Sequence, residues 1–510
     1  MFLVRFCLAA SVTALLFTPS EALSKDKPPA AAPIRSISGN LTLDEAVRIA
    51  LKQNPGILKA IQQIEQTRGQ IIEVRASALP HISADGSYSQ QAKSLSGGRG
   101  SGGSSLNSSD LSNIPGVTPG AAADIAQLLN ASLNQGRTSF GGGGDKSWNV
   151  SVQATQKLYA GGQVRAAIKI AKFTDDSSYY GLRDTLDQTI STVRQQFYTV
   201  LLNRELIKVQ EESVKLLGDQ LKDQQNRFEA GTVPRFNVLQ AEVALANQQP
   251  NLISAKNNYL IAEFQLAKTL GIDPGPQGQT TYNAVGELVV HERPFGLKSA
   301  IDLAVERRPF LKVQRLTILI QKEQVKVALA GYKPQLNANG GYELRNDSIS
   351  DQLDDTVNGW FFGVTGQWNI FDGLATYGKV KSARASLESA KINYDDSVHQ
   401  VQLEVQQAYA NLQTARETIR SQQKTVESAL EALRLSSERL SAGAGTQLDV
   451  LNAQVQLTTA RSTELQSRAN YNTALAEFDR VTATDTVYAK TFNDPLEKPV
   501  RKGQPARKKK

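Results

Sequence analysis

Hydrophobic and polar residues alternate strictly in four short segments of this chain. The four segments are about 81–90, 147–159, 335–346 and 358–371. In the second of them Val150 and Val152 fall on one face and Ser151 on the other. Period two over about ten residues, with aromatics near the ends, is typical of a membrane β-strand with an apolar lipid side and a polar lumen side. A soluble sandwich shows the same period, but the sequence predicts no further strands for a second sheet. The candidate membrane-interface aromatics are Tyr88, Trp148, Tyr342, Trp360 and Trp368.

Two stretches, 165–228 and 377–440, are predicted to be long helices without an internal proline. At 1.5 Å per residue, each would be about 95 Å long. Such a helix needs helical neighbours along its length, as in coiled coils. Each ends at a glycine-containing tip turn, 230–234 or 442–446, after which a second helix of roughly 36 residues returns. We therefore expect two long helical hairpins.

The two halves of the chain are similar to each other. An offset of 254 pairs Leu43 with Leu297, and an offset of 212 pairs Trp148 with Trp360. Eight of the nineteen positions in 227–245 are identical to their second-half counterparts. The two offsets differ by 42 residues, which lie in a Gly/Ser-rich, low-complexity stretch of the first half. We interpret the chain as an internal duplication of a helix–strand–strand–helix unit.

This duplication predicts the domain organisation. We expect a signal peptide at 1–24, a flexible segment at 25–40, a first repeat at 41–275, a linker at 276–295, a second repeat at 296–485 and a basic tail at 486–510. Within the first repeat, 91–146 is predicted to be a flexible extracellular loop.

Composition narrows the function further. Arg5, an apolar run and Pro19 form a secretory signal, and the chain's one cysteine, Cys7, lies inside it. One Cys and three His exclude a disulfide framework and leave little for a metal or cofactor site. Of the net charge of +8, six positive charges lie in the last ten residues, so no protein-wide basic field for nucleic acid remains. We predict neither cofactor nor metal.

Four strands cannot form a membrane barrel alone. The smallest membrane barrels need about eight strands. Open sheet edges do not occur in lipid because their N–H and C=O groups would have no partner. The chain must therefore oligomerise to insert, and the strand count permits a dimer or a trimer.

The doubled tip segments RFEAGTVPRFNVLQAEVAL and RLSAGAGTQLDVLNAQVQL, with the YAGG and FDGL junctions, resemble the TolC family of outer-membrane efflux proteins. The resemblance covers about 41–485. It implies a homotrimer with a 12-stranded outer-membrane β-barrel, continued by a helical tunnel across the periplasm. Such a tunnel meets a periplasmic adaptor protein and an inner-membrane transporter of RND, ABC or MFS type. It is an exit duct for small molecules or polypeptides, performs no chemistry and binds no nucleic acid.

The resemblance also places the tunnel gate around the second tip turn. Asp449 matches a gate aspartate, so a trimer would hold three carboxylates in a ring that favours cations and raises their pKa values by repulsion. The family's second aspartate is Asn452 here, and an arginine that braces the closed state in some members falls at Gly445. The partner site of that arginine in the first repeat is Asn237. The sequence thus keeps one acidic ring and lacks the charged latch.

Asp449 also suits a second role. An acidic residue just after a glycine turn commonly caps the next helix, and the two roles can coexist. The resemblance also places the docking site for the adaptor protein at the two tip turns. The docking residues would be Gly231, Thr232, Val233, Gly443, Ala444, Gly445 and Thr446.

Two other classes of protein compete with an export duct. A structural, periplasm-spanning coiled coil would have the helices without lipid-facing strands. An exported enzyme would need convergent acid, base or nucleophilic side chains, and neither repeat offers such a set.

Overall fold

A computed structural model describes residues 39–90, 146–273, 282–290, 296–346 and 356–484. The predicted signal peptide, the basic tail, nearly all of the flexible N-terminal segment and of the Gly/Ser-rich loop, and much of the linker lie outside the described residues. The chain divides into two compact units. The first comprises Met1–Gln62, Gly181–Phe310 and Val398–Lys510, and the second comprises Gln63–Tyr180 and Leu311–Ser397. Each unit draws on both predicted repeats.

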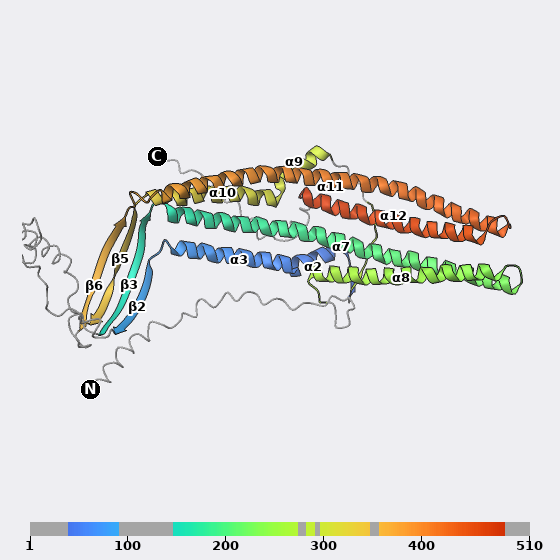
Figure 1. The fold of residues 1–510 in the computed structure, drawn as a ribbon, viewed down its shortest axis with the longest axis horizontal. Helices are drawn as coiled ribbons and strands as arrows, with labels where there is room; N and C mark the ends of the chain where they lie inside the picture. Colours follow the sequence, from blue (N-terminus) through green and yellow to red (C-terminus); the bar gives the residue numbers. More distant parts are fainter. Residues whose placement is uncertain (1–38, 91–145, 274–281, 291–295, 347–355, 485–510) are drawn as a thin grey trace, which may run out of the picture. The chain divides into compact units, whose positions relative to one another are not determined.

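The second unit contains a four-stranded antiparallel sheet (Figure 1). Its strands, in order across the sheet, are β2 (His81–Gln90), β3 (Lys146–Ala160), β5 (Gln335–Asn346) and β6 (Thr356–Gln367). Pro80 and Pro334 directly precede β2 and β5 and thereby separate each strand from the helical segment before it. Within the described chain, β2 pairs only with β3 and β6 only with β5, so the sheet keeps two free edges.

The fourth strand is shorter than the sequence predicts. It ends at Gln367 rather than at Phe371, because Gln367 pairs with Gln335, the first residue of β5. Pro334, the residue before it, has no N–H for a further rung. Trp368 therefore lies beyond the sheet, where its indole Nε1 donates to the main-chain oxygen of Tyr332 at 3.1 Å.

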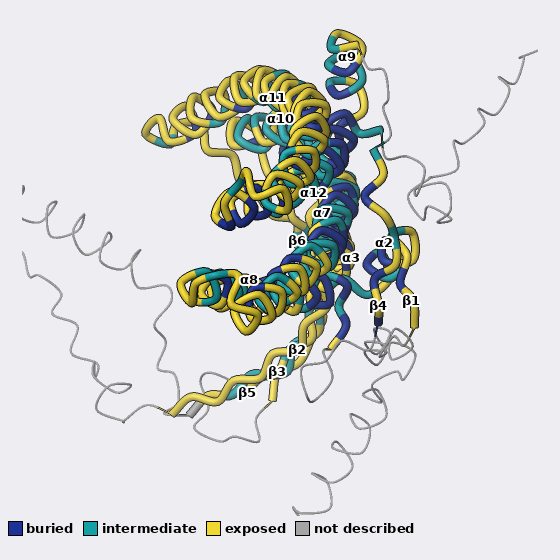
Figure 2. Tube along the Cα trace, turned by 90° about the vertical axis from the view of Figure 1, so that its right-hand side faces the viewer, coloured by how far each residue is buried: buried dark blue, intermediate teal, exposed yellow. Residues whose placement is uncertain are grey.

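The first unit contains a strand pair that the alternation did not predict. Strands β1 (Gly39–Leu41) and β4 (Tyr282–Ala284) are parallel neighbours, so the expectation of four strands was wrong. Both lie beside α2 (Leu43–Gln53) in Figure 2. The buried Leu41 and Ala284 join an apolar core with Phe197 of α7 (Gln163–Glu229). A three-residue strand is too short to show a period in the sequence.

The remaining helices follow the predicted order. They are α3 (Pro55–Ala76), α7 (Gln163–Glu229), α8 (Arg235–Leu270), α9 (Leu297–Arg307), α10 (Pro309–Leu329), α11 (Ala375–Ser441) and α12 (Gln447–Val481). A short 3₁₀ turn, Ala330–Tyr332, follows α10. Helices α7 and α11 each have 67 residues and are continuous. Among the described helices, none combines the length and the apolar character that a membrane span requires.

The end of α8 packs tightly against the junction of α2 and α3. Asn54 lies between these two helices, and its side-chain oxygen accepts from the N–H groups of Gly56 and Ile57, which caps α3. Its amide nitrogen donates to the Thr269 oxygen of α8 at 2.7 Å. The next turn of chain passes through Gly271 at φ 73°, directly over Gln53.

Candidate functional site

The two helical hairpins turn in the same way at their tips. Gly231 and Gly443 both have a φ of 72°, in the left-handed region that glycine adopts without steric cost. The next N–H, of Thr232 or Ala444, donates back to the oxygen of Arg227 or Arg439, at 2.9 and 2.8 Å. This is the Schellman arrangement, and it ends α7 and α11. The remaining docking candidates, Val233, Gly445 and Thr446, lie in the same two turns.

The second tip has a side-chain cap that the first tip lacks. The Asp449 carboxylate accepts from the Thr446 N–H at 2.9 Å and from its hydroxyl at 2.8 Å. In return, the Asp449 N–H donates to the Thr446 hydroxyl at 3.2 Å. This capping box begins α12, so the structure shows the capping role of Asp449. At the start of α8, Pro234 occupies the cap position and makes no side-chain hydrogen bond.

The three gate candidates lie in the first turns of the returning helices. Asp449 and Asn452 are exposed on α12, and Asn237 is half-buried on α8. No hydrogen bond among the described residues of this protomer joins any two of the three. The structure instead brings Asp449 together with Thr446 and within the electrostatic influence of Arg439.

Arg439 is a tip residue that the gate assignment missed. Its guanidinium Nη2 lies 3.3 Å from the Ala444 oxygen, at the outer limit of a hydrogen bond, and its charge favours the ionised form of Asp449. The sequence contains a signal for it, because Arg227 and Arg439 are identical in the doubled tip segment. Arg227 pairs instead with Asp223 at 2.9 Å.

Lowering the pH is expected to loosen the first turn of α12. The pKa of Asp449 is held below its ordinary value, first by the hydrogen bonds that Thr446 donates and then by the charge of Arg439. A lowered pKa means that the stabilisation is present above the ordinary aspartate value, about 3.9, and is lost as the pH falls through the lower folded value. In a single copy of the chain, without the repulsion of a carboxylate ring, hydrogen–deuterium exchange of this turn, normalised to intrinsic rates, should lose protection only below about pH 4.

The control for this measurement is Asp449→Asn, which keeps an acceptor oxygen but does not titrate. We expect its protection to be independent of pH over the same range. An equal loss in acid for the variant and the wild type would show that another group controls this turn.

Near the tips, α7 and α12 are joined by a neutral contact. The buried Gln224 amide donates to the Gln447 side-chain oxygen at 3.2 Å. Further along, the Thr458 hydroxyl lies 3.2 Å from the Ser213 hydroxyl. The sequence analysis missed these contacts between α7 and α12, because a buried glutamine on a helix has the same periodicity as a surface one. Within the described ranges, no group of three or more His, Cys, Asp or Glu side chains is placed to hold a metal ion.

The sheet has one apolar and one polar face. Ala84, Val152, Tyr342 and Trp360 form a row across all four strands, and the row Ile82, Ala154, Gly340 and Phe362 follows on the same face. This face is open to solvent in the protomer, where Trp360 is 81% exposed.

The opposite face carries hydrogen-bonded polar side chains. The Asn149 amide donates to the Glu343 carboxylate at 2.9 Å, and the Gln153 amide donates to Asp85 at 3.3 Å. A sheet with this division, over which the described residues place no apolar layer, needs another apolar surface.

Four of the five predicted interface aromatics pair across strands. Tyr88 lies directly opposite Trp148, and Tyr342 lies directly opposite Trp360. The fifth, Trp368, lies beyond the far end of β6. Four of these aromatics therefore lie within the sheet and one lies outside it, and a role for them at a membrane interface stays a prediction.

Comparison with known proteins gives a family. The model of the outer membrane efflux protein family matches residues 46–272 and 300–484. Nodulation protein T of Rhizobium leguminosarum is 21% identical over 82% of this chain and 80% of its own length. Outer membrane protein TolC of Escherichia coli is 23% identical over 69% of this chain and 73% of its own length. The chain spans less of two other relatives: 40% of Protein CyaE of Bordetella pertussis and 51% of Toxin and drug export protein A of Aggregatibacter actinomycetemcomitans.

Solved structures share the fold. The outer-membrane channel CmeC of Campylobacter jejuni superimposes with a TM-score of 0.67 at 19% identity, over 86% of this chain and 85% of that one. The outer-membrane channel OprN gives a TM-score of 0.66 at 15% identity, over 86% of this chain and 89% of that one. The chain therefore belongs to the outer membrane efflux protein family, whose fold is that of channels rather than enzymes.

Proposed function

We propose that three copies of this chain form a channel in the bacterial outer membrane that extends into the periplasm and is the exit duct of an efflux or secretion system. The two free edges of the four-stranded sheet carry this proposal. Lipid offers no partner for unpaired backbone groups, so β2 of one copy must pair with β6 of the next until the sheet closes. Three copies supply twelve strands. The apolar rows would then face lipid and the polar network would face the lumen.

The helical hairpins would continue the barrel as a twelve-helix tunnel with the six tip turns at its periplasmic end. We infer that the tips, from Gly231 to Val233 and from Gly443 to Thr446, receive a periplasmic adaptor protein that links the duct to an inner-membrane transporter. Their repeated backbone geometry supports a repeated docking mode, because a symmetric assembly presents the same turn several times.

The cargo is proposed only as a class. Two relatives are named for export of different molecules, Alkaline protease secretion protein AprF and Toxin and drug export protein A. A duct that performs no chemistry suits polypeptides and small molecules alike, and we propose that the transporter makes the choice.

Single-channel conductance of the detergent-purified protein in a planar bilayer tests the duct. We expect a cation-selective pore that a divalent cation blocks. Asp449→Ala should weaken both selectivity and block, because a ring of three carboxylates concentrates cations in a constriction. The charge-matched control is Asp219→Ala, which removes an exposed carboxylate of α7 away from the turns and should leave both properties unchanged.

Two results would change the proposal in different ways. A pore unaffected by Asp449→Ala would keep the duct and place the gate elsewhere. Failure of trimeric, folded protein to conduct would favour the alternative, a structural periplasm-spanning coiled coil without a pore.

A further inference from the structure

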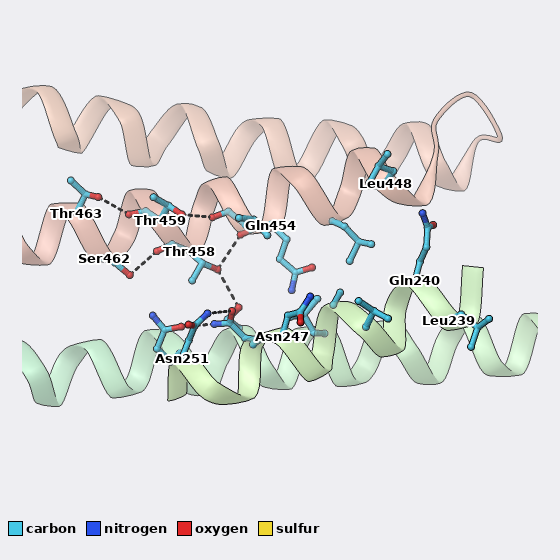
Figure 3. Close-up of a pocket in the computed structure, with 18 of the residues that line it drawn as sticks. Leu239, Gln240, Asn247, Asn251, Leu448, Gln454, Thr458, Thr459, Ser462 and Thr463 are labelled. Carbon is cyan, nitrogen blue, oxygen red and sulfur yellow. Dashed lines mark hydrogen bonds between the residues drawn. The ribbon is translucent and has the colours of Figure 1, made fainter. Parts of the chain in front are cut away.

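An uncharged groove runs between α8 and α12, with α7 as its floor, on the tip side of the first unit (Figure 3). Its volume is about 900 Å³, and none of the nineteen residues that line it is charged. The chain as a whole is 21% charged, and ion pairs such as Arg461–Glu212 lie on the neighbouring surface of α12 and α7. The groove is therefore chemically distinct from the helix surfaces around it.

The end of the groove nearest the turns is mainly apolar, and Gln240 is the polar residue that Figure 3 shows there. Phe236, Leu239 and Val243 line it from α8, and Leu448 and Val455 line it from α12. All five are substantially exposed in the protomer. Figure 3 shows Leu239 and Leu448 at this end, on opposite helices. This end can take an alkyl or aromatic group.

The other end presents hydroxyl oxygens as acceptors. Thr459, Ser462 and Thr463 each donate their hydroxyl hydrogen to a main-chain oxygen four residues earlier on α12, at 2.8, 2.8 and 2.9 Å. Their donors are thus used within the helix, while lone pairs on the same oxygens remain available. In Figure 3 this end lies away from the turn, opposite Asn251 of α8.

One buried donor lies between the two ends. Gln454 is 2% exposed, and its amide Nε2 has no hydrogen-bond partner among the described residues. Figure 3 shows its side chain pointing from α12 toward α8, into the groove. A buried amide N–H without an acceptor is unfavourable, so a group that supplies an acceptor here is bound with a gain.

We propose that this groove binds an uncharged amphiphile: an apolar chain toward the tips, an acceptor oxygen against Gln454, and a hydroxyl donor toward the Thr/Ser end. The volume lies within the range of small-molecule sites. A charged head group is disfavoured, because it would lose water in a groove that offers no opposite charge. The alternative occupant, a second copy of this chain, is an outcome of the test below.

The test uses three probes of one chain length: decane-1,2-diol, decylammonium and decanoate. Val455→Cys, in a Cys7→Ser background, places the chain's one thiol in the groove at a position that is 62% exposed. The control is Ile253→Cys, another exposed β-branched position (68%) on α8, outside the groove. Labelling rates with N-ethylmaleimide are measured in lipid nanodiscs at matched free probe concentrations.

We expect the diol to slow labelling of the Val455→Cys thiol about fivefold at a concentration four times its dissociation constant, and the two charged probes to have little effect. Labelling of the Ile253→Cys thiol should not change. Gln454→Leu, which replaces the unpartnered amide by an apolar group of similar size, should weaken the protection by the diol, while the charged probes should still have little effect. That replacement removes an unsatisfied polar group, so the protein should remain folded.

Three results would overturn the proposal. Equal protection by all three probes would mean an unspecific apolar surface. An unreactive Val455→Cys thiol without probe, beside a reactive Ile253→Cys thiol, would mean that another copy of the chain covers the groove. Unchanged protection by the diol in Gln454→Leu would mean that the buried amide has no part in recognition. Labelling needs folded protein but no ion conduction, so these outcomes are separate from those of the conductance test.

Discussion

Replacement of Gly271 by alanine is expected to lower the free energy of unfolding by about 3 kcal/mol or more. One part of the cost is conformational, since a φ of 73° disfavours any residue with a Cβ by about 1 kcal/mol. The larger part is steric. A Cβ at this position would lie 2.5 Å from the Gln53 main-chain oxygen and 3.0 Å from its carbon. These are backbone atoms of the α2–α3 junction, which Asn54 fixes to α8, so they cannot move away without loss of that contact.

Gly231→Ala separates the two contributions. Gly231 has nearly the same φ, 72°, but a Cβ there would meet nothing within 4 Å. Its cost should be the conformational part alone, about 1 kcal/mol. Denaturant unfolding of the purified proteins, followed by far-ultraviolet circular dichroism, measures both. Equal destabilisation by the two substitutions would show that the contact with Gln53 is relieved at no cost.

Helix ends were the most predictable part of the fold. The long helices were expected at 165–228 and 377–440 and lie at Gln163–Glu229 and Ala375–Ser441. The agreement is close because the residues that end them act locally. Gly231 and Gly443 adopt a conformation that a helix cannot continue through, so the signal needs no tertiary contact.

The positions of the strands were predictable in part, because the end of a strand also depends on where its partner strand begins. The alternation of β6 continues past Gln367, through Trp368 and Ile370, but the strand does not, because β5 begins at Gln335. The short pair β1 and β4 was not predictable. It depends on distant contacts such as the Arg204 guanidinium, which donates to the Ala284 and Gly286 oxygens at 2.7 and 2.8 Å. A pattern within three residues cannot predict such a distant contact.

Among the tip residues, too, those with a local role were predictable and those whose burial depends on packing were not. The spacing Thr-x-x-Asp at Thr446 and Asp449 is a local capping signal, and the structure shows the cap. The buried amides Gln224, Gln447 and Gln454 were missed, since their burial is created by the packing of α7 against α12. A helical wheel places them on a polar face and cannot tell that the face is covered. Gate and docking roles for these tips stay predictions, because they depend on partners that one chain does not supply.

Gly341→Ala is expected to prevent the sheet from forming. Gly341 lies in the middle of β5, opposite Gln153 of β3 and Phe361 of β6. A Cβ there would lie 2.4 Å from the Val152 main-chain oxygen and 2.9 Å from the Gln153 Cα. Both contacts are with the backbone of β3, so relief requires the two central strands to separate. We expect a loss of about 3 kcal/mol or more in each copy, and little or no folded protein in the outer-membrane fraction.

Gly359→Ala is the matched control on the same face of the same sheet. Gly359 lies on β6 and pairs with Glu343 of β5. A Cβ at Gly359 would meet nothing within 4 Å. Since glycine is unfavourable inside a strand, this substitution should be neutral or slightly stabilising. The measurement is the yield of folded, detergent-extracted protein on semi-native gels, compared between Gly341→Ala, Gly359→Ala and the wild type. If both accumulate like the wild type, β3 and β5 tolerate a side chain between them, and the close approach at Gly341 does not hold the sheet together. If only Gly341→Ala is lost, that close approach is a requirement of the sheet, and through it of any barrel that three such sheets would close.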